Sequence, residues 1–81
     1  MTNKEKRVFE LAIVGINYSI ERLQRRISRA SEYLYEIETG KPTLNKKSPV
    51  ELVGVILEKQ NKIKELEDLK FELECQLTED E

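Results

Sequence analysis

The sequence contains no histidine and no tryptophan, and Cys75 is its only cysteine. Without histidine the chain lacks the most common general base and the most common zinc ligand, and its thiol has no imidazole to activate it. A single cysteine cannot form an intrachain disulfide, and a lone thiol is typical of a reducing compartment. Phosphate-binding glycine motifs and EF-hand loops are also missing. We therefore expect a protein that is not an enzyme, with no catalytic residue, no metal site, no cofactor and no small-molecule substrate.

The sequence also lacks a long uninterrupted apolar run. Its most apolar stretch, from Val8 to Ile20, is interrupted by Glu10 and Asn17, and no small-residue cleavage site follows before Glu21. We therefore expect neither a signal peptide nor a transmembrane helix, and a cytoplasmic protein without a membrane partner. The composition, rich in Lys, Glu, Ile and Asn, resembles that of low-GC bacteria and their phages, which is compatible with a phage or mobile element as the source.

Helix-forming residues are abundant and regularly spaced. Charged residues make up 37% of the chain and hydrophobic residues 38%, with only three glycines and two prolines, which predicts an all-α protein. In the first half, nine apolar residues follow one another at alternating spacings of four and three, the a/d pattern of a coiled-coil seam. They are Phe9, Ile13, Ile16, Ile20, Leu23, Ile27, Ala30, Leu34 and Ile37.

Capping residues mark where the helices begin and end. Thr2 and Glu5 have the spacing of a capping box, Gly40 is suited to end a helix, and Ser48 followed by proline is suited to begin one. We predict a single domain with helices over 3–38 and 49–77, a loop over 39–48 and a frayed acidic tail over 78–81.

The second helix carries a weaker version of the same seam. Its apolar members are Leu52, Ile56, Ile63, Leu66, Leu73 and Leu77. Lys59 and Lys70 occupy the same stripe, where their aliphatic stems can cover the core while the ammonium groups reach water. Two long helices joined by a short loop predict an antiparallel two-helix coiled-coil hairpin, in which the numbers of facing residues sum to about 87.

Small and apolar residues outside the two seams form two clusters, which we expect at opposite ends of the hairpin. They are Val8, Leu11, Ala12, Gly15 and Tyr18 in the first helix, and Val50, Val53, Gly54 and Leu57 in the second. A second copy turned end to end would bring Gly15 level with about Gly54 and bury both clusters, giving a homodimeric four-helix bundle. A helix of an unidentified partner protein is the alternative occupant of either cluster.

Arg22, Arg25, Arg26 and Arg29 are spaced to share one face of the first helix. Residues 1–31 carry seven basic and three acidic side chains, whereas residues 32–81 carry seven basic and thirteen acidic ones. We expect the arginines to pair with acidic residues of the second helix, within the hairpin or across a dimer. The alternative is contact with nucleic-acid phosphates or with an acidic protein.

These patterns favour a non-enzymatic protein–protein interaction module that acts as a homo-oligomeric helical hairpin. A small regulator, an inhibitor or an assembly adaptor would each fit. A nucleic-acid-associated protein that uses the arginine face is the alternative.

Overall fold

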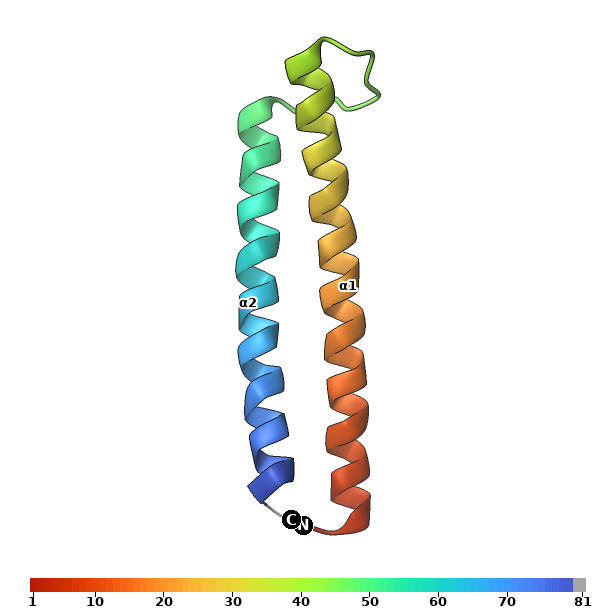
Figure 1. Cartoon of the computed structure of the whole chain (residues 1–81), viewed down its shortest axis with the longest axis vertical. Coiled ribbons are helices and arrows are strands. Elements are labelled where there is room, and N and C mark those ends of the chain that lie inside the picture. Colours follow the sequence, from red (N-terminus) through yellow and green to blue (C-terminus); the bar gives the residue numbers. More distant parts are fainter. Residues whose placement is uncertain (80–81) are drawn as a thin grey trace.

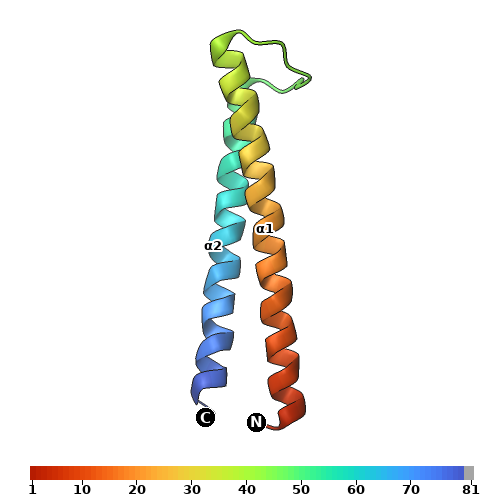
Figure 2. The same cartoon turned by 45° about the vertical axis from the view of Figure 1, so that its right-hand side comes forward.

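A computed structural model describes residues 1–79, and within that range the chain forms two α-helices and no strand. Helix α1 (Asn3–Thr39) and helix α2 (Pro49–Glu79) pack against each other (Figure 1). The start of α1 and the end of α2 lie at one end of the pair, and the loop over 40–48 lies at the other (Figures 1 and 2). The prediction of an all-helical chain built from two packed helices is confirmed.

The helix ends use the capping groups that the sequence indicates. The Thr2 Oγ1 atom accepts a hydrogen bond from the Glu5 N–H at 3.1 Å, and Ser48 Oγ accepts one from the Glu51 N–H at 3.2 Å. Gly40 adopts a left-handed conformation with φ of 71°, which glycine reaches without a Cβ clash. Its N–H donates to the Ile37 carbonyl at 3.2 Å and the Lys41 N–H donates to the Glu36 carbonyl at 2.9 Å, so the glycine-terminated cap satisfies these two carbonyls near the end of α1.

Helix α2 runs further than the sequence predicted. Thr78 and Glu79, which we assigned to the frayed tail, are helical, so that part of the prediction is wrong. The Thr78 hydroxyl donates to the Glu74 carbonyl at 2.9 Å, and no glycine or proline follows to end the helix. The rest of the predicted tail, residues 80–81, lies outside the described residues. Helix α1 ends at Thr39, one residue beyond the predicted end.

The core is a single strip between the helices. No member of either predicted seam is exposed, and Lys59 and Lys70 are half-buried within it, with side-chain exposures of 19% and 34%. Within residues 1–79 only Ile16, Ala30 and Leu52 are buried hydrophobic residues. The pair measures 57 × 16 × 15 Å, so most other side chains face water.

Candidate functional site

The described part of the chain offers surfaces rather than an enclosed reaction site. Within residues 1–79 no group of three or more His, Cys, Asp or Glu side chains is arranged to hold a metal ion. Over the same residues neither helix combines the length and apolarity that crossing a membrane requires. The candidates are therefore two apolar clusters, one basic face and the groove beside it.

The α1 cluster consists of Val8, Leu11, Ala12, Gly15 and Tyr18, and all five residues are exposed. Its three large side chains are between 54% and 59% exposed. A Cβ atom placed on Gly15 would meet nothing within 4 Å, so the backbone at Gly15 is open to the approach of another helix. The cluster lies in the half of α1 nearer the two chain ends (Figure 1).

The α2 cluster consists of Val50, Val53, Gly54 and Leu57, at the loop end of the hairpin. Val50 is 81% exposed, and a Cβ atom on Gly54 would also meet nothing within 4 Å. The structure therefore leaves both clusters uncovered within the described residues. It does not bring them together, because they occupy opposite ends of the hairpin.

The two clusters also lie on opposite sides of the hairpin. Residues two heptads apart lie on the same side of a helix. Three members of the α1 cluster are each followed two heptads later by an arginine, so they share the side of α1 that carries those arginines. The pairs are Val8 and Arg22, Ala12 and Arg26, and Gly15 and Arg29. Arg26 and Arg29 line a groove together with Val55 and Glu58 of α2. In the heptad pattern, Val53 and Leu57 flank the α2 seam on the other side. A single two-fold interface uses the same side of both copies, so one such interface cannot cover both clusters as we expected.

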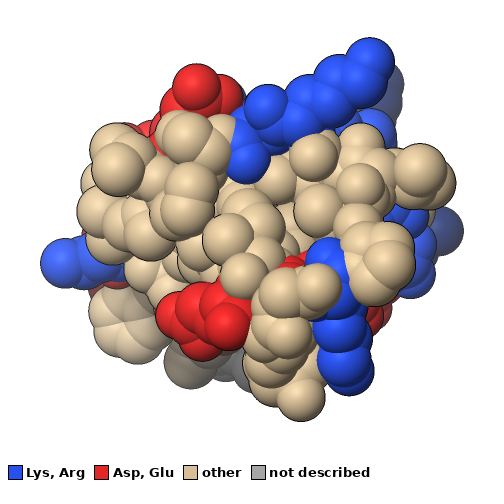
Figure 3. All heavy atoms as spheres, turned by 90° about the horizontal axis from the view of Figure 1, so that it is seen from above, with Lys and Arg blue, Asp and Glu red and all other residues tan. Residues whose placement is uncertain are grey.

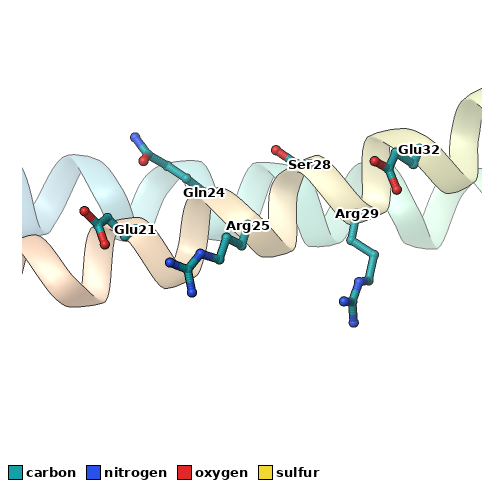
Figure 4. Close-up of a pocket in the computed structure, with 6 residues that line it drawn as sticks. All are labelled: Glu21, Gln24, Arg25, Ser28, Arg29 and Glu32. Atoms are coloured by element: carbon teal, nitrogen blue, oxygen red, sulfur yellow. The ribbon is translucent and has the colours of Figure 1, made fainter.

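The arginine face is exposed and has no acidic partner within the described residues. The ion pairs seen there are Arg7–Glu10, Glu58–Lys59 and Lys70–Glu74, each within one helix. The arginine pairing predicted within the hairpin is therefore wrong for this structure. Arg25 and Arg29 extend to the same side of α1 (Figure 4), and four arginines, Arg22, Arg25, Arg26 and Arg29, line one shallow depression.

Sequence reasoning missed a regular acidic row on α2. Glutamate recurs at every seventh position, and every member is exposed; the row comprises Glu51, Glu58, Glu65, Glu72 and Glu79. It also missed Phe71, which is 67% exposed and stands two heptads after Leu57. Tracing heptad spacing through the non-seam positions of α2 would have found both features.

Two tyrosines and a leucine near the loop do not line a common depression. Tyr33 lines the groove that holds Arg26 and Arg29. Tyr35 lines a different depression, with the Lys41 Nζ atom 5.0 Å from its ring centre. Leu44 is 95% exposed in the loop. Only Tyr33 therefore contributes to the same groove as the arginines.

Comparison with known proteins gives no family: no family model, curated protein or solved structure matches the chain.

Proposed function

We propose that this chain is a non-enzymatic protein–protein interaction module that self-associates. In this proposal it is an antiparallel coiled-coil hairpin that pairs into a homodimeric four-helix bundle, and it serves as a small regulator, an inhibitor or an assembly adaptor. The observation that supports this most is the exposed surface of 6390 Å². A compact monomer of 9.5 kDa exposes about 5,000 Å², so the hairpin alone leaves a large excess uncovered.

The dimensions of the hairpin fit a stable interface. A protein–protein interface of ordinary size buries roughly 800 Å² on each partner. One long side of the hairpin measures 57 by 16 Å and is large enough to supply that area. Such an interface would also bury further hydrophobic side chains, in addition to the three that are buried within the described range.

We assign the α1 cluster to the second copy and the α2 cluster to a partner protein. Ala12 and Gly15 are small, so they allow a second α1 helix to approach closely at the centre of the cluster. Val50, Val53 and Leu57 are branched and project from one end of α2, as suits the groove of a partner or its amphipathic helix. This division follows from the placement of the clusters on opposite sides.

Sedimentation equilibrium tests the self-association. At tens of micromolar the chain should have twice its monomer mass of 9.5 kDa, with dissociation on dilution. A monomer mass throughout that range would overturn the proposed dimer.

Nucleic-acid binding through the arginine face is the second candidate, and it is favoured because four neighbouring arginines have no acidic partner within residues 1–79. Binding to DNA or RNA would weaken steeply with salt, because each phosphate contact releases a counterion. Replacing all four arginines with glutamine should abolish that binding. If the unmodified chain fails to bind DNA or RNA at about 50 mM salt, nucleic-acid binding is ruled out.

A further inference from the structure

A groove of about 410 Å³ lies at the loop end of the hairpin, between α1, α2 and the loop. Two of the three buried residues, Ala30 and Leu52, line it and give it an apolar base. Its other walls come from α1, from α2 and from the loop residues Asn45 and Lys47. The groove is therefore built by three separate segments and exists only in the folded hairpin.

Positive charge dominates the lining. The four cations are Arg26, Arg29, Lys47 and Lys59, and Glu58 is the single carboxylate among the lining residues. The Glu58 Oε1 atom lies 3.8 Å from the Lys59 Nζ atom, which offsets part of its charge. Arg26 and Arg29 have no carboxylate partner within residues 1–79. The groove thus has a net positive charge and two guanidinium groups free to bind an anion.

The loop wall of the groove is held by its own hydrogen bonds. The Lys47 N–H donates to Asn45 Oδ1 at 3.1 Å, and Asn45 Nδ2 donates back to the Lys47 carbonyl at 2.7 Å. The Asn45 N–H donates to Thr43 Oγ1 at 3.1 Å. These bonds fix the backbone from which the Lys47 side chain extends, so this cation does not depend on an unrestrained loop.

The charge is concentrated on one side of the loop end. Seen from that end, lysine and arginine side chains project mainly from the right, where α1 and the loop lie in Figure 1 (Figure 3). Acidic side chains are visible mainly at the upper left and below the centre (Figure 3). An anion approaching from the loop end would therefore meet the cations first on the side of α1.

We propose that this groove binds a phosphate group, carried either by a small phosphate ester or by a nucleic-acid strand. A guanidinium group matches two phosphate oxygens with two parallel N–H donors, which makes arginine the preferred ligand for this anion. Tyr33, Leu52 and Val55 supply apolar surface beside the cations, suited to the organic part of a phosphate ester or to a base. The site is formed by the hairpin alone. It shares its side of the hairpin with the α1 cluster but lies at the loop end, so it is open in a dimer whose second copy covers the half of that side nearer Asn3.

A titration followed by nuclear magnetic resonance tests the site, with inorganic pyrophosphate and a short single-stranded oligonucleotide as separate probes. The amide signals of Asn45 and Lys47 should shift with at least one probe. The double variant Arg26→Gln/Arg29→Gln should weaken binding by about tenfold or more, because each lost charge-assisted hydrogen bond contributes to affinity. Glu58→Gln should tighten binding, since it removes the single carboxylate of the lining.

The matched control is Lys4→Gln/Lys64→Gln, which removes the same charge from exposed residues that neither line the groove nor belong to the arginine face. It should leave the affinity nearly unchanged. Equal weakening in both double variants, or no shift with either probe at millimolar concentration, would overturn the site. Binding of pyrophosphate alone identifies a small phosphate ester as the ligand, and tighter binding of the oligonucleotide identifies a nucleic-acid strand. Sedimentation of the groove variant should still show a dimer, which separates this test from that of the self-association.

Discussion

Helix α1 carries two lengthwise stripes with the same alternating spacing of three and four residues. The inner stripe is the seam of nine residues from Phe9 to Ile37, and none of them is exposed. The outer stripe is exposed at every position and comprises Val8, Leu11, Gly15, Tyr18, Arg22, Arg25, Arg29 and Glu32. The inner stripe is apolar from end to end, whereas the outer one changes from apolar to basic between Tyr18 and Arg22 and ends on Glu32.

This difference separates what builds the fold from what is left for association. The inner stripe finds its partner in α2 of the same chain over its whole length, so it must be apolar throughout. The outer stripe has no partner among the described residues. Its two halves can therefore differ in residue type, each suited to a different kind of partner. Apolar residues in one half favour burial against another helix. Exposed arginines in the other half disfavour burial there and favour an anionic partner.

The largest expected effect comes from the inner stripe. Ile16 is 8% exposed, and replacing it with alanine should destabilise the hairpin by about 2–5 kcal/mol, because a buried side chain is removed from a very small core. The measurement is urea denaturation followed by circular dichroism. Val14, two residues away and 63% exposed, provides the control, and Val14→Ala should change the stability by less than about 0.5 kcal/mol. Similar losses in the two variants would mean that the inner stripe does not form the core as described.

The next effect concerns the apolar half of the outer stripe. Gly15→Leu should keep the hairpin folded, because nothing lies within 4 Å of the new Cβ atom. It should weaken the dimer by about tenfold or more, because a bulky side chain would hold the second helix away from the cluster. Sedimentation equilibrium gives the dissociation constant, and circular dichroism confirms that the helices remain.

Gly54 provides the matched control, since it is also an exposed helical glycine with open space around it. Gly54→Leu should leave the dimer intact if the α1 cluster is the self-association surface. The opposite result would be a dimer that dissociates in Gly54→Leu and stays intact in Gly15→Leu. It would mean that the α2 cluster is the self-association surface and that the α1 cluster is left for a partner protein.

The features that the sequence predicted well are those set by nearest neighbours along a helix. The seam that contains Ile16, the half-buried position of Lys59 and the caps at Thr2 and Ser48 all depend on residues three or four apart. Two helices packed together followed from the same spacing. The loop-end groove was not predicted, because it joins Arg26 to Lys47 and other residues far apart in the chain.

The prediction that the arginines pair within the hairpin failed for a different reason. The register of the two helices predicts which charged residues lie at the same position along the hairpin. It does not predict whether a long side chain points toward the other helix. Arg22 and Glu65 are level by the predicted register, yet no ion pair joins them in the described structure. The opposite sides of the two clusters could have been predicted, because heptad positions fix them once the seam is known.

The smallest effect tests the arginine face, which consists of the three arginines of the outer stripe and Arg26 beside them. Replacing Arg22, Arg25, Arg26 and Arg29 with glutamine removes four like-charge neighbours at spacings of three and four, each pair costing about 0.2–0.5 kcal/mol. Because these side chains have no acidic partner among the described residues, the free energy of unfolding should rise by about 1 kcal/mol at low salt. The gain should shrink as added salt screens the repulsion. A fall in the free energy of unfolding at low salt would instead show that the arginines pair with acidic residues of α2 in solution. The arginines would then stabilise the hairpin, as the inner stripe does.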